Sequence, residues 1–263
     1  MNSWKVLRGV LRYEFLMQIR RPALWLAFLV FTLIDLRTVI GQVIELRNPG
    51  FSHMQFSVWQ TAAALAIMTN WLAPLGIGIL IADRLPRDRR TRAEEVLNSL
   101  PGTLKMRVLG KYLGTLLASL VPSFLLYLLI VGLAVWQLGN LGLIPAALLC
   151  YVLVVLPGMC FIAAFSLALP IIIWVPLYQF LFFGYWFWGN LLAPGYGLPT
   201  LSGTILTPIG SAIGVGFFGI PTFGGQEPSS TMYGVSSIVA LLGIAVLVLV
   251  VLYQFLRFEQ ARQ

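Results

Sequence analysis

The sequence predicts an all-α integral membrane protein, a single transmembrane domain over residues 1–263 with six membrane-spanning helices. Of its 263 residues, 59% are hydrophobic and 10% are charged, whereas a soluble domain carries about a quarter charged residues. One crossing of a bilayer takes about 20 apolar residues, and six apolar runs of about that length follow one another along the chain. We expect the six spans at 22–43, 58–82, 112–136, 143–169, 170–189 and 235–256.

The basic residues predict the orientation. Of the 17 Lys and Arg residues, 15 lie in the N-terminal segment, in the loop 83–111 and in the C-terminal tail. Because loops rich in Lys and Arg stay in the cytoplasm, we expect these stretches and both termini on the cytoplasmic side. The same placement argues against a nucleic-acid partner, since basic residues that flank apolar runs orient a chain in the lipid bilayer.

Residues 1–21 are predicted to form an interfacial helix that lies on the membrane. At 100° per residue Lys5, Arg8 and Arg12 fall on one side, and large apolar residues fill the opposite arc, which is typical of membrane-surface helices. Glu14 falls in the middle of the apolar arc. Two interpretations stay open: a carboxylate that reaches water at the headgroup level, or a buried partner for an arginine elsewhere in the chain.

The first span carries two charges in its outer half, Asp35 and Arg37. Intramembrane charges are costly and usually face protein or a water-filled cavity, although these two are also near enough in sequence to pair with each other. Farther along, Gly139-Asn140 predicts a tight outer turn, and Pro157-Gly158 is expected to interrupt the fourth span.

Residues 190–233 do not read as an ordinary solvated loop, because they are rich in glycine and proline and carry a single charge, Glu227. Within them Thr204 to Phe218 is apolar but shorter than a span. This length predicts a re-entrant or interface-lying helix on the outer face of the membrane.

No catalytic or metal-binding motif is found. A phosphate-binding loop requires G-x-x-x-x-G-K-[ST], but the one Gly-Lys pair, Gly110-Lys111, lacks the first glycine and is followed by Tyr112. Cys150 and Cys160, ten residues apart on one helix, are about 15 Å apart, too far for a disulfide. We therefore expect no enzymatic activity, no cofactor and no metal in this chain.

The loop 83–111 contains a helix signal. Thr91 and Glu94 have the spacing of a capping box, Pro101-Gly102 stops a helix, and Thr103 can cap the next one. We expect a short amphipathic helix from Thr91 to Leu100, held below the membrane between the second and third spans. A cytoplasmic partner could push such a helix; the alternative is a solvated loop whose charges only set the orientation.

The segment ADRLPRDRRTRAEEVLNSLPGTLKMRVLGKYLG resembles the cytoplasmic loop of type-2 ABC exporter permeases. In that family an acidic-basic stretch precedes a Glu-x-Leu … Leu-Pro helix and a Gly-Lys-x-x-Gly start of the third span. The matching residues here are Glu94-Glu95-Val96-Leu97, Leu100-Pro101, and Gly110-Lys111 with Gly114. The N-terminal LRYEFLMQIRRPALW is similar to the family's connecting helix, with Glu14, Arg20 and Arg21 in the places of its glutamate and arginines. The resemblance covers nearly the whole chain.

This resemblance implies the membrane subunit of an ATP-driven exporter in a prokaryotic plasma (inner) membrane. Two permease subunits, identical or related, would form the pathway, and two cytoplasmic ATPase subunits would bind ATP and Mg below them. Glu14 would pair with a nearby arginine. A groove of the ATPase would receive the coupling helix through Thr91, Arg92, Glu94, Glu95, Leu97 and Leu100.

Aromatic side chains suggest a pathway for the substrate. With Asn70 and Trp71 of the second span, the fifth span's Tyr178, Tyr185 and Trp186 could line an apolar path suited to a lipid, a drug or a hydrophobic peptide. The alternative is an aromatic belt with lipid-facing packing. Three other classes of function also stay open: a stand-alone secondary transporter of small solutes, a membrane enzyme that handles lipids, and a non-transporting scaffold.

Overall fold

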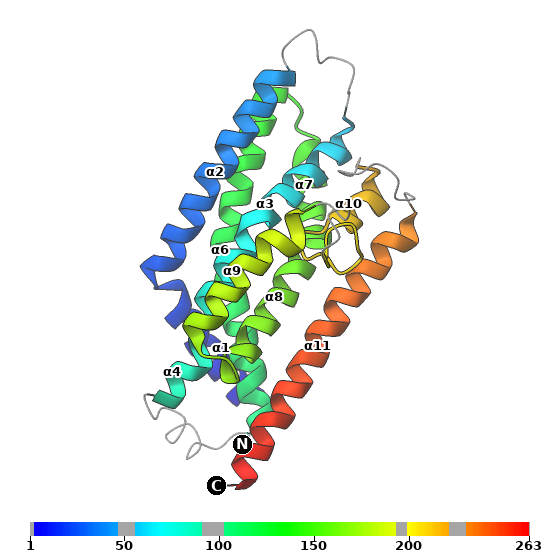
Figure 1. The fold of residues 1–263 in the computed structure, drawn as a ribbon. Helices are drawn as coiled ribbons and strands as arrows, with labels where there is room; N and C mark the ends of the chain where they lie inside the picture. The colour runs from blue at the N-terminus through cyan, green and yellow to red at the C-terminus, as the bar shows by residue number, and fades with distance from the viewer. Residues whose placement is uncertain (1–2, 47–55, 91–102, 193–198, 221–229, 263) are drawn as a thin grey trace.

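The computed structural model describes residues 3–46, 56–90, 103–192, 199–220 and 230–262 (Figure 1). These residues form helices and the connections between them, with no strand among them, which confirms the all-α class. The α-helices are α1 (Ser3–Ile19), α2 (Pro22–Leu46), α3 (Val58–Ile81), α4 (Arg84–Arg90), α6 (Leu104–Leu138), α7 (Leu143–Cys150), α8 (Leu156–Ala168), α9 (Val175–Leu191), α10 (Ser211–Phe218) and α11 (Thr231–Arg262).

Four helical stretches are long and apolar enough to cross a membrane. They are Val58–Arg89, Leu104–Leu138, Leu143–Ile171 and Thr231–Arg262. These stretches contain the second, third, fourth and sixth predicted spans. The first and fifth predicted spans are also helical, in α2 and in the 17-residue α9, but they are not among the four.

Successive long helices run in opposite directions. The colours of Figure 1 trace α2 away from the N-terminal end, α3 back, α6 away, α7 and α8 back, α9 away and α11 back. Both termini and α4 therefore lie at one end of the bundle. We call it the charged end, because α1, α4 and the last turns of α11 bring together there most of the charged side chains of the described residues.

α3 lies at the centre of the bundle and contacts α2, α6, α7, α8, α9 and α10. Its buried face is lined by small side chains, which let the neighbouring helices approach closely: Ala62, Ala63, Ala66 and Ala73. In contrast, α11 lies at the edge of the bundle and exposes a row of aliphatic side chains: Val239, Val246, Leu247, Val250 and Val251. The core is thus built around α3, and an apolar outer surface remains.

The fourth predicted span continues through its proline instead of being interrupted at Pro157-Gly158. A π-helical segment, Tyr151–Val155, joins α7 to α8, and Pro157 lies in the first turn of α8. Proline removes one backbone donor and crowds the preceding turn. A single π-helical turn accommodates this defect by widening the helix, so the chain stays helical across the whole stretch.

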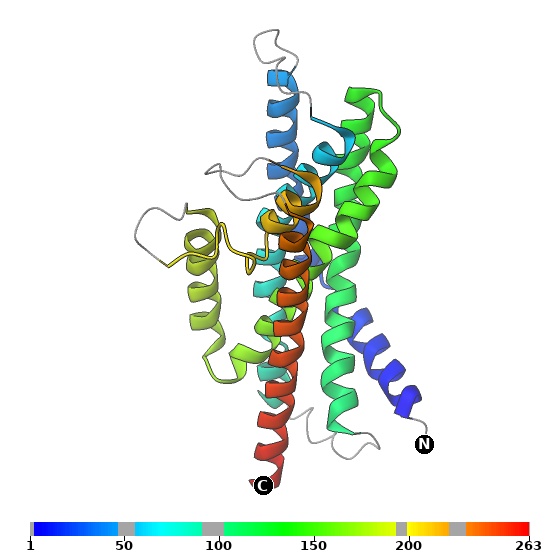
Figure 2. The ribbon, with the colours of Figure 1, turned by 90° about the vertical axis from the view of Figure 1, so that its right-hand side faces the viewer.

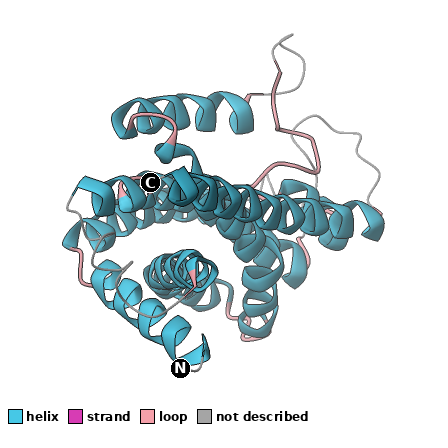
Figure 3. Cartoon of the chain, turned by 90° about the horizontal axis from the view of Figure 1, so that it is seen from below, coloured by secondary structure: helices cyan, strands magenta, loops and turns pink. Residues whose placement is uncertain are grey.

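The fifth helix begins at Val175, five residues later than the predicted start at residue 170. Residues Leu169–Ile171 form a 3₁₀ turn, and Pro176 lies in the first turn of α9. Proline is favoured there because its missing N–H is not needed. Figures 2 and 3 show α9 standing apart from the rest of the bundle, on one side of it.

Residues 199–210, which precede α10, are irregular. Of the predicted helix from Thr204 to Phe218, only α10 is helical, and Gly210 precedes it with φ +83°. A positive φ is readily adopted by glycine alone, which explains why the helix cannot extend toward Thr204. The predicted turn at Gly139-Asn140 is confirmed: Gly139, with φ +67°, ends α6.

A candidate functional site in a buried charge cluster

The N-terminal helix α1 packs obliquely along the first half of α6 (Figures 2 and 3). Two glycines of α6 permit this approach. A Cβ atom at Gly114 would lie 2.7 Å from Cβ of Glu14 and 2.8 Å from the carbonyl oxygen of Leu11, and one at Gly110 would lie 2.9 Å from the Val10 side chain. The absence of side chains at these positions brings Glu14 into the interior, against α6.

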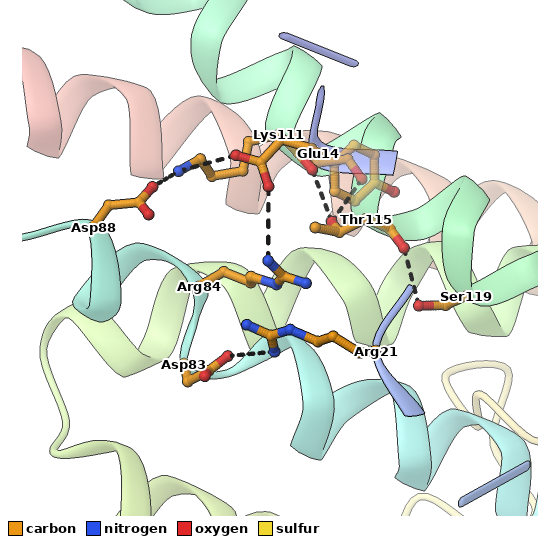
Figure 4. Close-up of polar contacts among 9 residues, drawn as sticks. Glu14, Arg21, Asp83, Arg84, Asp88, Lys111, Thr115 and Ser119 are labelled. Atoms are coloured by element: carbon orange, nitrogen blue, oxygen red, sulfur yellow. Dashed lines mark hydrogen bonds and ion pairs between the residues drawn. The ribbon is translucent and has the colours of Figure 1, made fainter. Parts of the chain in front are cut away.

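Glu14 is 4% exposed and lies between two basic side chains (Figure 4). Its Oε1 is 3.4 Å from Nζ of Lys111, and its Oε2 is 4.0 Å from Nη1 of Arg84, which is 2% exposed. Of the two interpretations of Glu14, the structure therefore shows the buried partner of a distant arginine. Burying one ionised carboxylate without a partner is expensive, and two cations offset that cost here.

Three further ion pairs extend the cluster across the charged end. Lys111 also pairs with Asp88 of α4, and Arg89 pairs with Glu259 of α11. Arg21, between α1 and α2, pairs with Asp83 at 3.4 Å. Ionic contacts thus connect α1, α4, α6 and α11, and join the α1–α2 connection to the α3–α4 connection. The segment 83–111 is attached to the bundle at both of its flanks.

A polar stripe in α6 begins at Lys111 and continues toward the middle of the helix. Thr115 and Ser119 follow at intervals of four residues, both fully buried, and Ser119 Oγ donates to the Thr115 carbonyl oxygen at 2.9 Å. Thr115 Oγ1 donates to the Lys111 carbonyl oxygen at 2.8 Å. Hydroxyl groups bonded to their own helix can be buried without an external partner.

The sequence signals of this cluster were incomplete. The sequence marks Lys111 through its Gly110-Lys111 pair, whereas Arg84 and Asp88 belong to the charged loop 83–111 with no local feature that singles them out. The four-residue spacing of Lys111, Thr115 and Ser119 on one helix face, beside Gly110 and Gly114, was a usable signal. It marks a polar, closely packed face of a helix that is otherwise apolar.

The proposed coupling residues Thr91, Arg92, Glu94, Glu95, Leu97 and Leu100 lie outside the described residues. Of the connecting-helix charges, Glu14 and Arg21 join the cluster, whereas Arg20 is exposed. The cluster therefore adjoins the predicted coupling segment on both sides of it.

Asn70 holds the irregular segment against the bundle. Its side chain is fully buried, and Nδ2 donates to the carbonyl oxygens of Val154, at 3.0 Å, of Pro208, at 3.4 Å, and of Ile209, at 3.3 Å. Val154 lies in the π-helical segment, where the widened turn changes the hydrogen-bonding pattern. Gly158 packs directly beneath the Pro208 carbonyl group. Asn70 thus satisfies carbonyl groups from two irregular parts of the chain.

The aromatic residues of the predicted pathway divide into two groups. Trp186 is buried and donates from Nε1 to the carbonyl oxygen of Trp71 at 2.7 Å, and Tyr178 is buried with its hydroxyl group 2.8 Å from Ser166 Oγ. The side chains of Trp71 and Tyr185 are exposed. The buried aromatic residues attach α9 to α3 and α8, and the exposed ones lie on the outer surface.

Asp35 is the one acidic side chain buried within α2 among its described side chains, with 6% of its surface exposed. Arg37 is exposed, and no ion pair joins the two in the part of the chain that the structure describes. Asp35 therefore faces protein rather than its neighbour in sequence.

Cys150 and Cys160 are both free thiols. Over the described ranges, no group of three or more His, Cys, Asp or Glu side chains is arranged to hold a metal ion. No family model matches the sequence, and no curated protein matches it either.

Proposed function

We propose that this chain is the membrane permease subunit of an ATP-driven exporter of the type-2 ABC class, and forms half of a translocation pathway. The observation that carries the proposal is the buried contact of Glu14 with Arg84 and Lys111. This contact ties the amphipathic α1 to both flanks of the segment 83–111, the segment in which the resemblance puts the contact with an ATPase.

The directions of the helices support six crossings. α8 and α11 both run toward the charged end, so the chain between them has to return, and α9 is the helix that does so (Figure 1). By the same reasoning α2 crosses from the charged end, where α1 lies, to the far end of the bundle, where α3 begins. At 1.5 Å per residue the 17 residues of α9 rise about 25 Å, close to the thickness of a bilayer core. Both termini are then cytoplasmic in a plasma (inner) membrane.

The ion pairs suggest how force is transmitted. Arg84 follows α3 directly and Lys111 belongs to α6, so a push on the segment between them reaches two spans at once. Through Glu14 the push also reaches α1. A buried ion pair resists separation, because parting its members leaves uncompensated charges. α1, α3 and α6 would then move as one body between inward- and outward-facing states.

The proposed partners are those that the resemblance implies. Cytoplasmic ATPase subunits bind ATP and Mg²⁺ and contact the segment 83–111, and a second permease subunit, identical or related, completes the pathway. The outward face of α9 exposes apolar side chains to lipid or to that subunit, among them Leu177, Phe180 and Phe183. A substrate that is hydrophobic or amphipathic suits these surfaces, and Asn70, Trp71, Tyr178, Tyr185 and Trp186 remain the candidate pathway residues.

A stand-alone secondary transporter is the second candidate, and the burial of Asp35 favours it. An ionisable side chain within a membrane helix often belongs to a proton or ion pathway. In that case the driving force would be an ion gradient, and no ATPase would be required.

Gentle affinity purification of the tagged chain from its native membrane separates these proposals. We expect a roughly stoichiometric ATP-hydrolysing subunit to accompany the wild type and to be lost from the double variant Glu94→Ala/Leu97→Ala. The variant Lys5→Gln, at an exposed position of α1 outside the segment 83–111, is the control and should retain it. If the chain purifies alone and moves solute in vesicles under an ion gradient, the exporter proposal is wrong.

A further inference from the structure

The charge cluster contains more hydrogen-bond donors than acceptors. Three donors of Arg84 (Nε, Nη1 and Nη2), Nη2 of Arg21 and both side-chain amide atoms of Gln18 are buried without a hydrogen-bond partner among the described residues, and so is one carboxylate oxygen, Oε2 of Glu14. More than nine in ten buried polar groups in proteins have a partner, and one guanidinium group alone offers five N–H donors. A buried set composed mostly of donors calls for a ligand that supplies several acceptors.

The neighbouring carboxylates do not fill this role. Glu14 Oε2 is 4.0 Å from Arg84 Nη1, which is beyond hydrogen-bond distance, and Asp83 engages the other terminal nitrogen of Arg21. Figure 4 shows the guanidinium groups of Arg21 and Arg84 lying next to each other. Two such cations repel at close range in a medium of low polarity, and an anion that contacts both relieves this repulsion.

We propose that Arg84 and Arg21 bind a phosphate group. Guanidinium groups form paired hydrogen bonds with phosphate oxygens, and a phosphate offers enough oxygens to accept from both arginines. Gln18 is fully buried and lies between Glu14 and Arg21 along the chain, one helical turn after Glu14 on the same face of α1.

The position of the site points to the headgroup of an anionic phospholipid as the source of the phosphate. Arg21 immediately precedes α2, and Arg84 follows the last apolar turn of α3, so both lie where helices would leave the hydrocarbon layer. Asp83, the ion-pair partner of Arg21, lines a cleft together with Pro86, Arg87, Trp174, Val175 and Pro176. Tryptophan is enriched at the headgroup level. This inference rests on the membrane insertion proposed above and not on transport.

A phosphate group in this site would link two parts of the chain: Arg21, in the connection between α1 and α2, and Arg84, the first residue of α4. A phosphate group bound there would add a second contact to Arg84, which Glu14 of α1 already approaches. We therefore expect the stability of the charged end to depend on anionic lipid.

Thermal unfolding of the full chain, delipidated in detergent, tests the proposal. The unfolding temperature is measured against dioctanoyl-phosphatidylglycerol and, separately, against inorganic phosphate, with ionic strength held constant by chloride. A rise with the lipid alone identifies a headgroup site, and a rise with inorganic phosphate as well identifies a site open to free phosphate. Either result supports a phosphate site.

Three variants show whether the response belongs to this site. Arg84→Gln and Arg21→Gln should each weaken the response to the ligand about tenfold or more, since each removes charged hydrogen bonds. Arg12→Gln, an exposed arginine of α1, should leave it unchanged. Arg21, which is partly exposed, carries the test if Arg84→Gln fails to fold.

The proposal is overturned if neither probe raises the unfolding temperature of the wild type, or if Arg12→Gln weakens the response as much as Arg21→Gln does. The measurement needs no ATPase, so its outcome is independent of the co-purification experiment. Failure of the membrane insertion itself would show separately, as a chain that stays in solution without detergent.

Discussion

Replacing Glu14 with glutamine tests the charge cluster most sharply. The side chain keeps its size but loses its charge, so two cations remain around a neutral amide. Lys111 retains Asp88 as a partner, whereas within the described residues Glu14 is the one carboxylate within 4.0 Å of Arg84. Removing one partner of a buried ion pair destabilises a protein by about 3–5 kcal/mol, and we expect a loss of that size.

The assay is the free energy of unfolding, from denaturant titration in detergent micelles. Glu259→Gln is the matched control, because Glu259 pairs with Arg89 with 38% and 33% of their side chains exposed. Partly exposed pairs contribute about 1 kcal/mol or less. The double variant Glu14→Gln/Arg84→Gln should be less destabilised than the sum of its single variants. If Glu14→Gln costs no more than Glu259→Gln, the cluster does not fasten α1 to the bundle.

Three other predictions concern the packing and the coupling. Gly158→Ala should destabilise the protein by about 1–3 kcal/mol, because the added Cβ would overlap the Pro208 carbonyl oxygen. The control Gly132→Ala, where a Cβ meets open space, should be neutral or slightly stabilising. Equal unfolding temperatures for the two variants would contradict this packing. Asn70→Leu leaves three backbone carbonyl groups without their donor and should cost about 1–3 kcal/mol, with an unchanged unfolding temperature as the contrary result. In vesicles that hold the chain with the proposed ATPase, Leu97→Pro should leave ATP hydrolysis uncoupled from transport. Wild-type transport in this variant would refute the proposed coupling role of the segment 91–100.

The long helices could be predicted from the sequence, because a continuous apolar run of about 20 residues indicates a membrane-spanning helix. Their ends were harder to predict. Pro170 and Pro176 are both acceptable in the first turn of a helix, and α9 begins beside the second one. Pro157 favoured an interruption by local rules, but the π-helical turn absorbed it.

The site could be predicted only in part, because its contacts join residues far apart in the sequence. The amphipathic pattern put Glu14 on an apolar face, which fitted a buried carboxylate and a carboxylate at the headgroup level equally well, and nothing local identifies Arg84 and Lys111 as its partners. The same limit applies to Asn70, whose bonds reach Val154, Pro208 and Ile209. Residue spacing reports on one helix at a time, whereas these contacts depend on how helices pack.

A map of which residues face each side of the membrane tests the central claim, a six-span bundle with its charged end in the cytoplasm. Cys150 and Cys160 are first replaced by alanine, and single cysteines are then introduced as Asn140→Cys, Met232→Cys and Ala261→Cys, all at exposed positions. A membrane-impermeant maleimide applied to the outside of intact cells should label the first two and leave Ala261→Cys unlabelled until the membrane is opened. Labelling of Asn140→Cys and Ala261→Cys from the same side would contradict the account.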